Sequence, residues 1–145
     1  MEPLFSKQEE QQLVEAIQKA EAHTSGEIRV HVEHHCPPDV LKEAKRVFQK
    51  LGMHRTAARN GVLILLAPER RGFAIVGDAG IDAVVPPGFW DAERDLMAGY
   101  FREGRFADGI CAAVEAVGEK LKGHFPVSKE DTNELSDDIS YGGKS

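Results

Sequence analysis

The feature that most constrains this 145-residue chain is an uninterrupted apolar stretch in its middle, Gly61-Val62-Leu63-Ile64-Leu65-Leu66-Ala67. Its length suits one β-strand and is far too short to cross a bilayer. A strand that is apolar on both faces is typical of the interior of a sheet covered on both sides. The stretch therefore predicts a central strand over residues 61–67 and a fold that buries both of its faces.

A second strand is predicted upstream, where polar and apolar residues alternate from Glu27 to Glu33. The alternation gives one apolar face and one polar face, and we expect the polar face to be solvated. A helix over residues 7–23 is predicted to precede this strand, because Ser6 and Glu9 fit a capping box. Another helix is expected after it, capped near Asp39 and carrying an apolar stripe from residue 40 to residue 51.

The second half of the chain predicts one more strand over residues 73–76 and then helices. The short turn at residues 68–72 makes the last two strands an antiparallel hairpin. Apolar spacing marks helices near residues 80–85, 89–101 and 106–121. Without the short helix near residues 80–85, the order is α-β-α-β-β-α-α, and with a right-handed crossover between the first two strands it predicts the α/β class. The expected architecture is a three-layer α/β/α sandwich around a small, mixed, Rossmann-like sheet.

Composition sets the expected domain organisation and surroundings. We expect a single domain over residues 1–125 and an acidic C-terminal tail, extended or mobile, over residues 126–145 that carries about half of the net charge of −6. An acidic chain without a basic stripe predicts no nucleic-acid partner. Cys36 and Cys111 suggest free thiols of a reducing compartment. The N-terminus does not resemble a signal peptide, so we expect a cytoplasmic location and no membrane span.

The predicted topology brings polar residues together at one end of the sheet. Parallel strands beginning near residues 27 and 61, and an antiparallel strand finishing near residue 77, place three polar loops side by side. They contain Glu27, Asn60, Asp78 and Asp82, whose hard oxygen donors suit Ca²⁺ or Mg²⁺. Arg59 is a candidate for binding the charge of a substrate. The alternative is that these are ordinary polar loop ends that bind nothing.

The histidines are clustered in the sequence, but their spacing does not predict a metal site or a catalytic site. His34, His35 and Cys36 are consecutive, so they cannot all face one site from a regular strand, and no second zinc motif completes them. His31 alternates outward with Glu33, which is typical of a solvated strand face. The spacing of His35 and Cys36 imitates a cysteine phosphatase loop, but two prolines remove the N–H groups that such a loop needs.

Four stretches in order resemble the TPM domain family, named after a thylakoid lumen protein, its photosystem II relative and a nematode receptor-associated protein. They are Thr24-Ser25-Gly26-Glu27-Ile28, Asn60-Gly61-Val62-Leu63-Ile64-Leu65, Ile75-Val76-Gly77-Asp78-x-Gly80-Ile81 and the run from Phe101 to Ile110. The similarity covers about residues 5–125 and suggests a short, cytosolic branch of bacterial type with an added tail.

The resemblance implies an α/β/α sandwich that binds a divalent metal, often calcium. It also implies the acid phosphatase activity ascribed to the plant relative, or a role in assisting membrane complexes. One departure is informative: where the family usually has Asp-Asn-Gly, this chain has Arg59-Asn60-Gly61. A cation replaces a carboxylate there, which argues against both metal affinity and phosphatase activity.

Three hypotheses follow from the sequence. The first is a metal-dependent phosphatase using Asp78 and Asp82, although no catalytic nucleophile can be identified. The second is a non-catalytic protein-interaction module or assembly factor, whose unidentified partner would bind the polar face of residues 27–33 or the acidic tail. The third is a domain whose polar sheet end binds nothing.

Overall fold

The computed structural model describes residues 4–127 and 138–142. Helices and strands follow one another in the order α1 (Lys7–Glu21), β1 (Glu27–Glu33), α2 (Val40–Lys50), η1 (Met53–Arg55), β2 (Gly61–Ala67), η2 (Pro68–Arg70), β3 (Gly72–Gly77), α3 (Ala79–Asp82), α4 (Asp91–Arg102), α5 (Phe106–His124) and β4 (Ser140–Gly142). Within these ranges, no helix has the length and apolar character needed to cross a membrane.

The sheet is mixed and has the strand order β3-β2-β1-β4. β1 and β2 are parallel, with Glu27 opposite Gly61, and β2 and β3 are antiparallel, with Val62 opposite Gly77. These pairings confirm the predicted crossover and hairpin. The fourth strand, β4, runs parallel to β1 at the sheet edge, with His31 opposite Ser140, and the predicted element order did not contain it.

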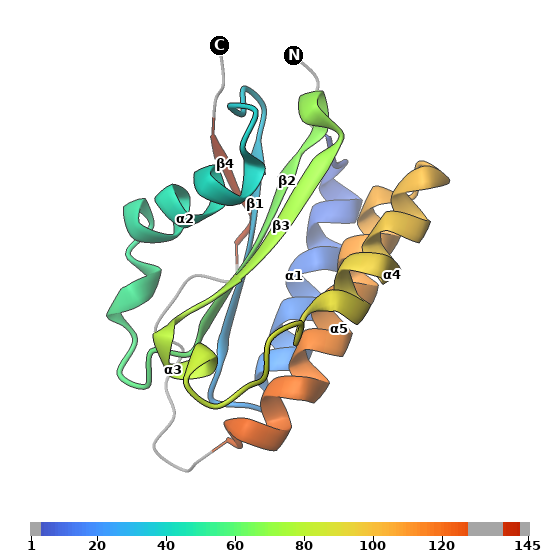
Figure 1. Ribbon diagram of the computed structural model, residues 1–145. Coiled ribbons are helices and arrows are strands. Elements are labelled where there is room, and N and C mark those ends of the chain that lie inside the picture. Colours follow the sequence, from blue (N-terminus) through green and yellow to red (C-terminus); the bar gives the residue numbers. More distant parts are fainter. Residues whose placement is uncertain (1–3, 128–137, 143–145) are drawn as a thin grey trace.

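Helices cover both faces of the sheet, as the apolar stretch predicted. Figure 1 shows α2 on one face and α1, α4 and α5 on the other. Successive residues of β2 point into two separate apolar cores. Val62, Ile64 and Leu66 pack toward α1, α4 and α5, while Leu63, Leu65 and Ala67 pack toward α2. The architecture is therefore the expected three-layer α/β/α sandwich.

Local signals set the helix boundaries. The side chains of Ser6 and Glu9 form a reciprocal capping box, with backbone-to-side-chain distances of 3.0 and 3.1 Å. Asp39 accepts a hydrogen bond from the Lys42 amide at 3.1 Å and caps α2. Gly52 follows α2 with φ of 71°, a left-handed conformation that costs glycine little. The helix predicted over residues 7–23 ends two residues early, at Glu21.

The expectation that β1 has a solvated polar face is wrong. Glu27, His31 and Glu33 are only 3, 4 and 5% exposed. At His31 and Glu33 the physical cause is coverage: β4 pairs along the edge of β1 at residues 31–33, and Glu43 of α2 is also buried. The tail predicted over residues 126–145 therefore includes part of the sheet at residues 140–142. Residues 128–137 and 143–145 of that prediction lie outside the described residues.

Candidate functional site

Three loops meet where β1 and β2 begin, as the topology predicted. The Glu27 amide donates to the Asn60 carbonyl at 3.3 Å, and the Asp78 amide donates to the Gly61 carbonyl at 3.0 Å. The Gly80 amide donates to the Arg59 carbonyl at 2.8 Å. These backbone bonds join segments that are far apart in the sequence. The three segments that carry the predicted site residues are therefore held together by direct backbone hydrogen bonds.

Gly80 allows the closest approach in this assembly. A Cβ atom built on Gly80 would lie 2.2 Å from the Ala58 carbonyl oxygen and 2.6 Å from the Arg59 carbonyl oxygen. Both distances are far below van der Waals contact, and both neighbours are backbone atoms that cannot swing aside. Only glycine fits between α3 and the segment before β2.

Asp78 is the best-placed carboxylate, but the guanidinium of Arg59 already forms an ion pair with it. Its side chain is 6% exposed and accepts two hydrogen bonds from Arg59, Nε to Oδ2 at 2.8 Å and Nη2 to Oδ1 at 2.9 Å. Oδ1 also accepts from the Ala79 amide at 2.8 Å and caps α3. The bidentate geometry is the strong form of an Arg–carboxylate pair. Arg59 thus pairs with the carboxylate predicted to bind metal.

Asn60 is 1% exposed and lies at the centre of the three loops. Its amide nitrogen Nδ2 donates to the Ser25 hydroxyl at 3.3 Å, and its backbone N–H donates to Thr56 Oγ1 at 3.3 Å. Its side-chain oxygen Oδ1 has no hydrogen-bond partner among the described residues. A buried oxygen left in this state costs free energy, about 1–3 kcal/mol.

The hydroxyls of Thr24 and Ser25 are held by α5 as well as by the site. Thr24 donates a hydrogen bond to the Phe125 carbonyl, and the Ser25 amide donates to the same carbonyl at 2.9 Å. Thr24 Oγ1 also accepts from the Gly26 amide at 3.1 Å. The opening of β1 is therefore fixed to the end of α5, and of these two hydroxyls that of Ser25 bonds to the Asn60 side chain.

The two remaining predicted ligands differ in exposure. Glu27 is 3% exposed, whereas Asp82 is exposed on α3, one helical turn beyond Asp78. Across residues 4–127 and 138–142, no three His, Cys, Asp or Glu side chains are grouped so as to hold a metal ion. The donors at this sheet end are therefore amide, hydroxyl and backbone oxygens around one or two carboxylates. Thr56, buried beside Asn60, is a polar member that the sequence pattern did not reveal.

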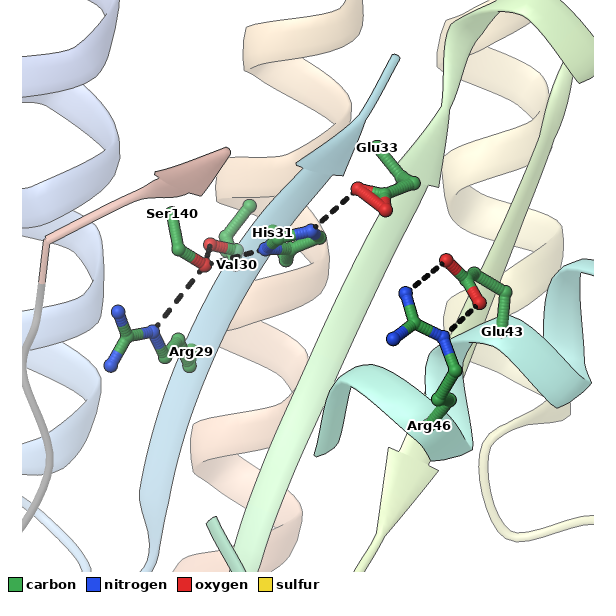
Figure 2. Close-up of polar contacts among 7 residues, drawn as sticks. All are labelled: Arg29, Val30, His31, Glu33, Glu43, Arg46 and Ser140. Atoms are coloured by element: carbon green, nitrogen blue, oxygen red, sulfur yellow. Dashed lines mark hydrogen bonds and ion pairs between the residues drawn. The ribbon is translucent and has the colours of Figure 1, made fainter. Parts of the chain in front are cut away.

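A second polar cluster is buried at the opposite end of β1 (Figure 2). His31 Nδ1 lies 2.8 Å from the Ser140 hydroxyl, and His31 Nε2 lies 3.1 Å from Glu33 Oε2. Burial lowers the pKa of His31 from its ordinary value, and the hydrogen bond to Glu33 opposes that shift. Arg29 Nε also reaches the Ser140 hydroxyl at 3.4 Å. The cluster fastens β4 to β1.

Glu43 extends this cluster from α2. Its carboxylate accepts two hydrogen bonds from Arg46, at 2.6 and 2.8 Å, and these lower its pKa against the opposing effect of burial. Glu33 also lies within hydrogen-bonding reach of Glu43. A sequence signal for Glu43 existed, because it lies at helical spacing within the apolar stripe of α2. Ser140 gave no such signal.

The fold and the sheet end together define a class: a small α/β/α domain whose two parallel strands begin at a site rich in oxygen donors. The sequence profile of the TPM domain matches residues 1–120. The chain belongs to the TPM domain family, which confirms the resemblance seen in the sequence.

Solved structures agree with this assignment. The NMR structure of the BA42 protein from the psychrophilic bacterium Bizionia argentinensis is 42% identical, covers 98% of each chain and superposes with a TM-score of 0.92. The N-terminal domain of the cg2496 protein from Corynebacterium glutamicum shares the fold at 19% identity, with a TM-score of 0.66 over 91% of this chain and 84% of that chain. An N-terminal domain from P. gingivalis does so at 21% identity, with a TM-score of 0.67 over 84% and 79%. A comparison with curated proteins finds no significant match.

Proposed function

We propose that this TPM domain binds a divalent cation, Ca²⁺ or Mg²⁺, where β1 and β2 begin. The observation that carries the proposal is the buried Oδ1 atom of Asn60, which has no hydrogen-bond partner among the described residues. A hard cation is a natural ligand for an amide oxygen. The backbone of Glu27 bonds to Asn60, and the backbone of Asp78 bonds to the neighbouring Gly61, so both residues belong to the segments that meet at this oxygen.

Arg59 determines how tightly such a cation would bind. Its guanidinium occupies both oxygens of Asp78, so a metal ion has to draw at least one oxygen away. Asp82, exposed one turn along α3, would add negative charge near the site. With so few free carboxylates, we expect a dissociation constant of about 10⁻⁴–10⁻³ M, the range of weak oxygen-donor sites.

A phosphatase activity is the further expectation from the family. The side chain of Arg59 is 47% exposed, so its guanidinium can bind a phosphate group while it keeps its ion pair with Asp78. The described residues offer no nucleophile in an activated state here, because the hydroxyls of Thr24 and Ser25 bond to a carbonyl and an amide rather than to a base. Metal binding is therefore the function that the geometry supports best, and the catalytic residues stay unassigned.

The alternative function, a protein-interaction module, had two predicted binding surfaces, and one of them is largely buried in the structure. Three of the four polar side chains on the polar face of β1, those of Glu27, His31 and Glu33, are buried, so a partner cannot reach them while the packing holds. The acidic tail remains a predicted surface and falls mostly outside the described residues.

Titration with CaCl₂ and MgCl₂, followed by ¹H–¹⁵N correlation spectra, tests cation binding. Saturable shifts are expected at residues 25–27, 59–61 and 78–82. Asp78→Asn should weaken binding, whereas Asp95→Asn, the same change on the exposed surface of α4, should not. At a hundred times the dissociation constant, the cation should stabilise the fold by about 2.7 kcal/mol. Absence of saturable shifts at several millimolar cation would refute the proposal.

Hydrolysis of p-nitrophenyl phosphate tests the phosphatase. Activity should require the cation, disappear with EDTA and fall in Asp78→Asn. If wild type and Asp78→Asn hydrolyse the ester equally, this site is not responsible for the activity.

A further inference from the structure

We propose a second site, for a small organic anion with an apolar ring or chain, at the other end of β2. A cavity of about 580 Å³ lies between the turn that joins β2 to β3 and the junction of α4 with α5. Its volume falls within the range of small-molecule sites, about 300–1,000 Å³. Leu66 and Ala67, at the end of β2, line it, whereas the cation site lies where β2 begins. Figure 1 shows this turn and the α4–α5 junction at the same end of the molecule.

The cavity wall is aromatic. Phe73 of β3, Phe101 of α4 and Phe106 of α5 all line it, and each is only partly buried. The rings of Phe73 and Phe101 pack edge to face, with centroids 5.2 Å apart, and Phe101 and Phe106 are also 5.2 Å apart. These mutual contacts hold the rings in place while leaving part of their surface uncovered. The uncovered surface can bury the apolar body of a ligand.

Two arginines give the cavity its charge. Arg71 and Arg102 both line it, both are exposed, and neither has an ion-pair partner among the described residues. Arg105, in the short connection that follows Arg102 and α4, differs: it bonds to Asp108 at 3.1 Å and stacks over the ring of Tyr100. Two unpaired guanidinium groups beside an apolar wall suit one anionic head, because the planar fork of arginine matches a carboxylate or a phosphate.

Arg71 also adopts a costly backbone conformation. Its φ is 51°, in the left-handed region that glycine or asparagine enters with less strain. A charged, exposed residue at such a position is a reason to look for a role of its side chain. Arg102, Phe101 and Phe106 belong to the stretch of residues 101–110 that carried the family resemblance, and the cation site makes no use of that stretch.

The site takes a ligand with two parts. The apolar part contacts the three phenylalanines, and a carboxylate or phosphate lies between the two arginines. A neutral aromatic molecule lacks the charged contact, and a small inorganic anion lacks the apolar one. Both should therefore bind more weakly than a molecule that combines the two parts.

Titration with 2-naphthoate, followed by ¹H–¹⁵N correlation spectra in the presence of EDTA, tests the site without a contribution from the cation. Saturable changes in amide chemical shift are expected at residues 66–73 and 98–106. The neutral 2-naphthalenemethanol and acetate should bind at least about fivefold more weakly. Naphthalene-2-phosphonate distinguishes the two heads, and tighter binding by either anion at these residues supports the site. Equal binding of the neutral alcohol, or shifts elsewhere only, would overturn the proposal.

Charge-neutralising variants locate the head group. Arg71→Gln and Arg102→Gln should each weaken 2-naphthoate binding by about fivefold, and the double variant should bind more weakly than either single variant. Arg55→Gln removes the same charge from an exposed arginine outside the cavity and should change nothing. Circular dichroism verifies that each variant is folded. Because both arginines are exposed, unfolding is not expected, and unchanged affinity in the folded double variant would refute the assignment.

Discussion

Replacing Gly80 by alanine is the sharpest test of how the three loops meet. Gly80 lies in the short helix α3, where intrinsic propensity alone predicts that alanine would stabilise by up to about 1 kcal/mol. The tertiary structure predicts the opposite sign. The new Cβ would lie 2.2 Å from the carbonyl oxygen of Ala58 and 2.6 Å from that of Arg59.

The expected magnitude follows from what must move. Neither carbonyl can rotate out of the way, so the backbone has to separate by about 1 Å, and overpacking of this kind costs about 1–3 kcal/mol. The same movement stretches the 2.8 Å hydrogen bond from the Gly80 amide to the Arg59 carbonyl, which adds about 1 kcal/mol. After the propensity gain is subtracted, we expect a net destabilisation of about 1–3 kcal/mol and a fall in Tm of about 3–9 °C.

Gly99→Ala is the matched control. Gly99 lies within α4, and a Cβ there would meet nothing within 4 Å, so the variant should gain about 0.5–1 kcal/mol from helix propensity. Thermal and urea unfolding, followed by circular dichroism, measure both variants. If Gly80→Ala proves as stable as the wild type while Gly99→Ala is stabilised, the close packing of α3 on the Arg59 segment is refuted.

Three further predictions rest on individual side chains. Arg59→Gln should tighten Ca²⁺ binding at least about threefold, because Asp78 loses its competing cation; weaker binding in a calcium titration would contradict this. Burial lowers the pKa of His31, so the unfolded chain takes up its proton first, and stability should fall as the pH drops from about 7 through about 6.5. Urea midpoints should show a flatter decline in His31→Gln and an unchanged one for exposed His35→Gln; equal declines in all three would disprove the assignment. Burial raises the pKa of Cys111 from 9.0 to about 11, so its thiolate fraction at pH 8 should be about a hundredfold lower than that of an ordinary thiol. A reaction with Ellman's reagent as fast as that of free cysteine would be inconsistent with that burial.

Much of the fold was predictable because its signals are local. The apolar run of β2, the alternation of β1 and the caps at Ser6 and Asp39 each depend on a few neighbouring residues. Handedness and hairpin rules then restricted the topology, and the meeting of residues 27, 60 and 78 followed from it. Local patterns and chain connectivity therefore suffice to indicate which end of the sheet carries the candidate cation site.

The state of that site was not predictable. Arg59 and Asp78 were both singled out in the sequence, yet with separate roles, because nothing local indicates that the two side chains lie 2.8 Å apart. The unpartnered oxygen of Asn60 depends on which of its neighbours lie within reach. These side-chain contacts depend on how three segments pack together, so the residue pattern of any one segment does not predict them.

The sequence by itself determined the α/β class, the strand pairing of its centre and the end of the sheet that carries polar residues, because hydrophobic periodicity and chain connectivity suffice for these. Only the tertiary structure decided that the polar face of β1 is buried and that Ser140–Gly142 completes the sheet. The alternation of β1 records which side chains share a face, but exposure depends on what the rest of the chain places over that face. Glu43 from α2 and β4 from beyond residue 137 supply that cover, and both are distant contacts.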